Sequence, residues 1–185
     1  QRQMCIRDSR YDGYDTRIYR SLKDDGNSLP DSYIEDIQED ATGNLWVRTG
    51  AGYAIYNSVS DIFDRNVEGW MWHIGISGNP STVYIDSEKI FWIYVAGKGI
   101  YCYKPGQENA VMVAGTDTLL TEMNITDMTE CSEGILLAFG NGVLACLDRE
   151  KLNVKWTFDG IASQWGKNQS ETFTLFVDSH ERVWM

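Results

Sequence analysis

The 185-residue sequence lacks the features that mark nucleic-acid-binding, membrane-spanning or zinc-binding proteins. No run of lysine or arginine interrupts its formal net charge of −11, so the chain repels polyanions and nucleic acid is not an expected partner. The longest apolar run, 90–96, is far too short to cross a bilayer as a helix. With two histidines, and four cysteines without a C-x-x-C pair, no metal site is expected, and we interpret the cysteines as buried free thiols.

Proline and helix signals are also scarce. Three prolines against 17 glycines, ten tyrosines and seven tryptophans favour many short strands joined by glycine turns. Residues that are hydrophobic make up 43% of the chain, which is enough to build a core. The start of the chain has no apolar stretch of the kind found in secretory signals. Residues 1–9 fit no pattern in the rest of the sequence, and we interpret them as a remnant foreign to the fold or an artefact.

What the sequence does contain is a repeat of about 46 residues. Its central position is held in turn by Trp46, Trp92, Leu137 and Trp184, at intervals of 46, 45 and 47 residues. An aspartate precedes each of the three tryptophans by six residues, at Asp40, Asp86 and Asp178. Aspartate caps tight turns by accepting backbone N–H bonds, so we interpret these three residues as turn scaffolding. A repeat of this length indicates one small unit of structure used several times.

Each unit is typical of a four-stranded antiparallel sheet. The second strand is apolar at successive positions, as in 90–95, so both of its faces must be covered. A small sheet packed on copies of itself through both faces is a β-propeller blade. The sequence therefore predicts an all-β propeller fragment with about three complete blades, at 32–64, 81–114 and 124–158. Partial blades are expected at 10–20 and 171–185, which makes the propeller of residues 10–185 incomplete.

Three stretches of the first unit carry a family resemblance. The runs 11–14, 28–40 and 43–49, the last reading Gly-Asn-Leu-Trp-Val-Arg-Thr, resemble the two-component regulator propeller repeat. That repeat builds the periplasmic sensor region of hybrid two-component histidine kinases. The resemblance implies a ligand sensor on the extracytoplasmic side of an inner-membrane protein, commonly one for oligosaccharides. The repeat motif is structural, so it transfers no binding residue and implies no cofactor.

The candidate ligand-binding residues are tryptophans that lie where the repeat breaks. Trp70 and Trp72 occupy one link between blades, and Trp165 occupies the corresponding link later in the chain. Indole faces stack on the apolar faces of sugar rings, which makes these side chains candidate sugar contacts. The alternative is that they fill space between blades.

The leading hypothesis is a non-enzymatic sensor propeller that binds an oligosaccharide or another small ligand and signals to a kinase. Its other expected partners are further blades of the same parent chain, and a homodimer is left open. One alternative is a propeller enzyme of the sialidase or lyase kind, although the sequence shows no recurring arginine cluster and no catalytic residue is assigned. The other alternative is a protein-interaction scaffold.

Overall fold

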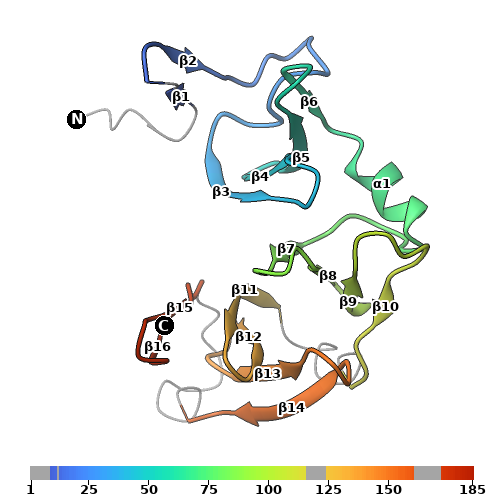
Figure 1. The fold of residues 1–185 in the computed structure, drawn as a ribbon, viewed down its shortest axis with the longest axis vertical. Helices are drawn as coiled ribbons and strands as arrows, with labels where there is room; N and C mark the ends of the chain where they lie inside the picture. Colours follow the sequence, from blue (N-terminus) through green and yellow to red (C-terminus); the bar gives the residue numbers. More distant parts are fainter. Residues whose placement is uncertain (1–8, 12, 116–123, 161–171) are drawn as a thin grey trace. The chain divides into compact units, whose positions relative to one another are not determined.

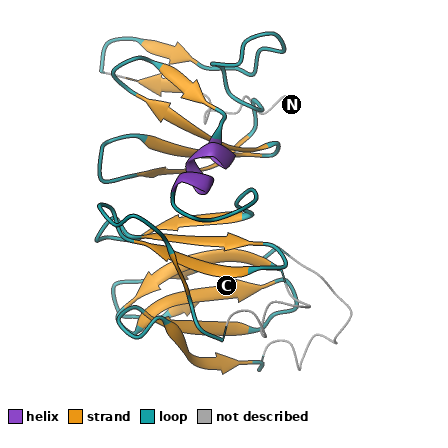
Figure 2. Cartoon of the chain, turned by 90° about the vertical axis from the view of Figure 1, so that its right-hand side faces the viewer, coloured by secondary structure: helices purple, strands orange, loops and turns teal. Residues whose placement is uncertain are grey.

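The computed structural model describes residues 9–11, 13–115, 124–160 and 172–185. It divides into two compact units, 1–73 and 74–185, each of which is described by itself. Almost all of the regular structure is antiparallel sheet (Figures 1 and 2). Within the described part of the chain, no helix has the length and apolar character needed to cross a membrane.

The first unit holds one strand pair, one four-stranded sheet and one helix. Its elements are β1 (Ser9–Tyr11), β2 (Thr16–Ile18), β3 (Ile34–Glu39), β4 (Leu45–Thr49), β5 (Gly52–Asn57), β6 (Ile62–Asp64) and α1 (Val67–His73). The strands β3 to β6 pair in chain order and form the sheet that we name the first blade. β1 pairs with β2, so Ser9, which the sequence pattern left outside the repeat, belongs to a strand.

The second unit holds two four-stranded sheets and a final strand pair. The second blade consists of β7 (Thr82–Ile85), β8 (Phe91–Val95), β9 (Gly99–Tyr103) and β10 (Val111–Met112). The third blade consists of β11 (Ile125–Cys131), β12 (Gly134–Phe139), β13 (Leu144–Asp148) and β14 (Asn153–Phe158), and it is followed by β15 (Phe176–Val177) and β16 (Val183–Trp184). Each blade pairs its strands in chain order, which confirms the predicted all-β fold of four-stranded antiparallel blades.

The second strand of each blade lies at the centre of the packing. Every residue of β8 and of β12 is buried, as expected for strands covered on both faces. Trp92 on β8 is completely buried, and Leu137 on β12 is nearly so. Both belong to one apolar cluster that the second and third blades share. Successive apolar residues in the sequence therefore correspond to a strand packed between two layers.

In three of the repeats, the first hairpin is closed by the carboxylate of its own aspartate. In the second blade, Asp86 Oδ1 accepts hydrogen bonds from the backbone N–H groups of Glu88 (3.0 Å) and Ile90 (2.9 Å). Its Oδ2 accepts the indole Nε1–H of Trp92 at 3.0 Å. Asp40 and Asp178 each accept the same three bonds. The indole Nε1–H of Trp46 lies 3.3 Å from Asp40 Oδ2, and that of Trp184 lies 3.1 Å from Asp178 Oδ2. The aspartate therefore fixes both the turn and the tryptophan six residues later.

The bonds around Asp178 also stabilise its charged form. Partial burial would raise the pKa of this carboxyl, but the N–H groups of Arg182, Trp184 and His180 outweigh burial and hold the pKa at about 2. The carboxylate therefore stays ionised, and its turn stays closed, through the whole ordinary pH range.

The third blade begins with a different hairpin. Cys131 pairs with Gly134, so only Ser132 and Glu133 form the turn, and no aspartate closes it. Gly134 has φ of +149° and lies directly against the Leu147 carbonyl on β13. Cys131 precedes Leu137 by six residues, which is the spacing of the turn aspartates, but it lies on β11. The reason is that the shorter turn lets β11 and β12 pair for one more residue, Cys131 with Gly134.

Helix α1 was not expected, because helix signals are weak in this part of the sequence. Asn66 caps it, since its side-chain oxygen accepts the Gly69 N–H at 3.1 Å. Val67 and Met71 are buried on one side, and Trp70 packs edge-to-face on Trp46 with ring centroids 4.6 Å apart. The link after β6 is thus a capped helical turn that covers a core tryptophan.

Replacing Gly134 by alanine should destabilise the chain. The added Cβ would overlap the Leu147 carbonyl oxygen, a backbone atom of the paired strand that cannot rotate away. We expect the free energy of unfolding to fall by at least about 2 kcal/mol in denaturant unfolding followed by tryptophan fluorescence. Gly26→Ala is the matched control, because nothing lies within 4 Å of its Cβ position. Equal stability of the two variants would contradict the described packing of β12 on β13.

Removing the Asp86 carboxylate should be costly. Asp86→Ala leaves three donors without their acceptor, in a turn where Asp86 is 3% and Trp92 0% exposed. We expect a loss of about 3 kcal/mol in the same unfolding measurement. Asp178→Ala removes an equivalent carboxylate at an exposed tryptophan, so its effect should be much smaller because water replaces the lost acceptor. An equal loss of stability in both variants would show that burial does not determine how much the aspartate–indole hydrogen bond contributes.

Candidate functional site

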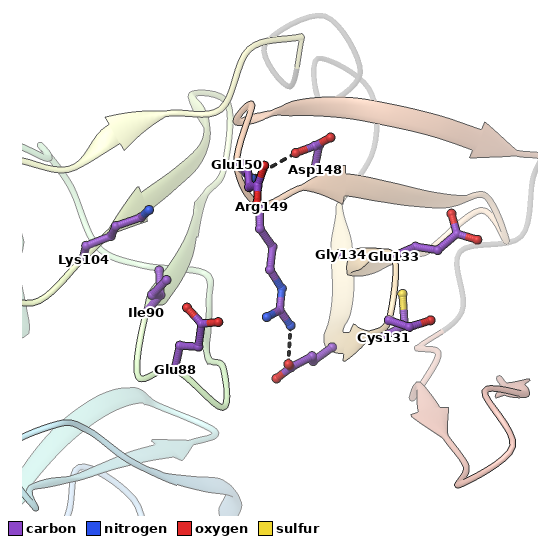
Figure 3. Close-up of a pocket in the computed structure, with 11 residues that line it drawn as sticks. Glu88, Ile90, Lys104, Cys131, Glu133, Gly134, Asp148, Arg149 and Glu150 are labelled. Carbon is purple, nitrogen blue, oxygen red and sulfur yellow. Dashed lines mark hydrogen bonds and ion pairs between the residues drawn. The ribbon is translucent and has the colours of Figure 1, made fainter.

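A pocket lies where the turns of the second and third blades meet, and we name it the turn pocket. It has a volume of about 690 Å³, within the range of small-ligand sites. Three turns form its walls: β7–β8, β11–β12 and β13–β14, joined by the residue that follows β9 (Figure 3). Its charged lining consists of Glu88, Glu130, Glu133, Asp148, Glu150, Lys104 and Arg149. The pocket is therefore polar and carries more negative than positive charge.

An ion pair between Glu130 and Arg149 crosses the turn pocket (Figure 3). The same Glu130 carboxylate accepts the Ser87 backbone N–H at 2.9 Å and the Ser87 hydroxyl at 2.7 Å. Burial would raise the pKa of Glu130, but the bonds from Arg149 and Ser87 outweigh it and hold the pKa below its ordinary value. Glu130 thus stays ionised and joins the third blade to the first turn of the second.

The carboxylates of the turn pocket differ in what they already bind. Glu133 accepts hydrogen bonds from Trp156 Nε1 (3.1 Å), and Asp148 accepts the N–H groups of Glu150 and Lys151 (3.0 and 2.9 Å). By contrast, no side-chain bond from a described residue reaches Glu88, Glu150 or Lys104. Two carboxylates and one ammonium group are therefore available to a ligand.

The two described candidate tryptophans, Trp70 and Trp72, do not line this pocket. Trp70 and Trp72 are on α1, but they are two residues apart and so face different sides of the helix. Trp70 is half-buried against Trp46, as the space-filling alternative expects, whereas Trp72 is 74% exposed. Trp165 lies outside the described residues. The structure thus leaves Trp72 as the one described member of the three with an accessible indole face.

The buried thiols are unsuited to nucleophilic chemistry. Burial raises the pKa of Cys102 to about 11 and the pKa of Cys146 to about 12. A thiol in this range is almost entirely protonated at neutral pH, and the thiolate is the reactive form. Among the described residues, no group of three or more His, Cys, Asp or Glu side chains is arranged to hold a metal ion.

A second polar cluster lies in the first unit, between β2 and the first blade. The hydroxyls of Tyr19 and Tyr56 donate to Asp61 Oδ1 at 2.8 and 2.7 Å, and Arg10 donates to the Tyr56 hydroxyl at 3.0 Å. Burial and these neighbours raise the pKa of Tyr56 well above its ordinary value. The adjoining pocket is about 160 Å³, smaller than most ligand sites. This cluster therefore serves to hold β1 and β2 against the first blade.

Arg65 and Arg149 are the two structurally important residues that sequence reasoning missed. Arg65 donates to the Ser28 carbonyl and hydroxyl (both 2.7 Å) and to the Leu29 carbonyl (2.6 Å). It thereby fixes the segment that leads into β3, in which Leu29 is completely buried. Neither arginine recurs in the repeat, so the period gave no signal for them.

Residues 28–51 match the family described as two component regulator propeller. The matched range covers the Arg65-bound segment, β3, the Asp40 turn and β4. Comparison with curated protein sequences gives no match.

The fold of this chain is similar to that of solved extracellular domains. The extracellular domain of BT4673 from B. thetaiotaomicron, assigned as a one component system, is 19% identical with a TM-score of 0.56 over 89% of this chain and 19% of that one. The extracellular domain of BT3049 from the same organism, assigned as a hybrid two component system, is 13% identical with a TM-score of 0.56 over 91% of this chain and 21% of that one. The chain thus spans about a fifth of the length of these structures. The chain is built from β-propeller blades, and the first blade includes the residues that match the two-component regulator propeller family.

Proposed function

We propose that this chain is a ligand-sensing propeller segment in the extracytoplasmic region of a membrane-bound hybrid two-component system, and that it binds oligosaccharides. The observation that carries the proposal is the turn pocket, which is lined by residues of the second and third blades. The likeness to extracellular domains of such systems supports the location and the role.

The turn pocket suits a ligand rich in hydroxyl groups. Free carboxylates at Glu88 and Glu150 accept hydrogen bonds from hydroxyls, and the Lys104 ammonium donates to them. The apolar part of a sugar would find a partner in Ile90, which also lines the pocket. Trp72, in the first unit, is proposed as a separate saccharide contact, because its exposed indole offers a face for stacking.

Ligand binding in the turn pocket would change the hydrogen bonds that join neighbouring blades. The Glu130 carboxylate joins the third blade to the Ser87 turn of the second. In the same way, Glu181 accepts the Ser132 N–H at 3.0 Å and joins the turn before β16 to the turn of the third blade. A saccharide that contacts these turns would tighten or loosen a series of bonds from blade to blade. In the proposed parent protein, that change would be passed to the kinase.

The enzymatic alternative gains no support from the described residues. The Tyr19, Tyr56 and Asp61 cluster combines tyrosine, carboxylate and arginine, as a sialidase would, but Tyr56 is a poor nucleophile with its raised pKa. It is also buried, with 3% of its surface exposed. We therefore propose binding without turnover.

Calorimetry with neutral, acidic and amino oligosaccharides tests the proposal. We expect saturable binding of at least one class, with no hydrolysis product detected in the same sample. At the separate contact on the first unit, Trp72→Ala should weaken saccharide binding by about threefold to tenfold through loss of a stacking face, whereas Tyr33→Ala, another exposed aromatic of that unit, should not. The absence of binding by any class to the folded chain would contradict the proposed function. Unchanged affinity in Trp72→Ala would exclude that contact.

The link between the second and third blades can be tested through Glu130. Glu130→Gln removes the charge that holds Arg149 and weakens the acceptor for Ser87. We expect a loss of about 2 kcal/mol in the free energy of unfolding, since bonds to charged groups contribute about that much. Glu133→Gln, in the next turn but more exposed, is the matched control and should cost less. Equal losses would show that Glu130 has no special role in joining the blades.

A further inference from the structure

The charge balance of the turn pocket points to a particular class of saccharide. Five carboxylates and two cations line it, and one of those cations, Arg149, is already paired with Glu130. The whole chain has a formal net charge of −11, so no surrounding excess of positive charge offsets this lining. An anionic ligand would therefore meet repulsion both on approach and in the pocket.

The available groups are placed on opposite walls. Glu88 lies on the β7–β8 turn and Glu150 on the β13–β14 turn. Figure 3 shows Arg149 extending from its turn between these two walls, where it forms its ion pair with Glu130. No described hydrogen bond or ion pair reaches the carboxylate of Glu88 or Glu150, although the charge of Glu88 also acts on Arg149, so no direct donor must be displaced before a ligand binds. A ligand that carries amines could pair with both carboxylates at once.

We propose that the turn pocket is the saccharide site and that it selects sugars bearing free amino groups over sugars bearing carboxylates. This inference rests on the proposed function and specifies its ligand class. Protonated amines of the sugar pair with Glu88 and Glu150, while ring hydroxyls bond to Lys104 and to the remaining carboxylate oxygens. A bare divalent cation is not the favoured occupant, because the described carboxylates do not converge on one point.

The test compares three trisaccharides by calorimetry at about pH 6 and low salt, where sugar amines are protonated. Glucosamine trimer should bind most tightly, its N-acetylated form more weakly, and galacturonate trimer not measurably. Added salt should reduce the difference between the first two, because it screens the charge interaction. Galacturonate binding as tight as glucosamine binding would overturn the proposal. Spermidine binding as tight as the glucosamine trimer would overturn its saccharide part.

Charge reversal locates the site. In the double variant Glu88→Lys and Glu150→Lys, affinity for the glucosamine trimer should fall by at least about tenfold, and binding of galacturonate trimer should appear. The matched control is Asp24→Lys with Glu68→Lys, which changes the net charge equally at exposed positions of the first unit. Unchanged glucosamine affinity in the pocket variant, with normal unfolding behaviour, would overturn the pocket assignment. If the unaltered chain bound no saccharide at all, the proposed function itself would fail.

Discussion

A carboxylate that accepts three N–H groups is the interaction on which the blades depend. At Asp40, Asp86 and Asp178, one oxygen closes a five-residue turn and the other holds the indole six residues further on. The turn sets where the second strand starts, and the indole sets how deep that strand lies in the packing. Because Trp92 is wholly buried, its N–H needs an acceptor inside the protein, and Asp86 supplies it. This requirement explains why an aspartate and a tryptophan recur together in the sequence, six residues apart.

The third blade shows what happens where the interaction is absent. Leu137 has no side-chain N–H that needs an acceptor, and the hairpin closes with a two-residue turn before Gly134. The neighbouring carboxylate, Glu130, is then directed to Ser87 and Arg149 instead of to its own turn. The turn pocket forms at this place. Departure from the repeat and the candidate site therefore coincide in the third blade and its boundary with the second.

Much of the fold could be predicted because its causes are local. Each of these causes involves residues within about ten positions of one another. They are strand pairs separated by short turns, consecutive apolar residues and capping aspartates. The second strands of the first two blades, 45–49 and 91–95, contain the repeat tryptophans at 46 and 92 that the sequence pointed to. The helix α1 was missed because it depends on the Asn66 cap and on Trp70 packing against Trp46, which is 24 residues away. The site was harder still, since it joins Glu88 of the second blade to Glu130 and Arg149 of the third, and the period does not show which turns meet.

The central claim is that ligand binds at the turns shared by the second and third blades. Backbone N–H chemical shifts of the isotopically labelled chain, followed during titration with glucosamine trimer, test it most directly. The account predicts saturating shifts concentrated at 87–90, 131–134 and 148–150, with the first blade largely unchanged. Saturating shifts that leave these three turns unaffected would contradict it.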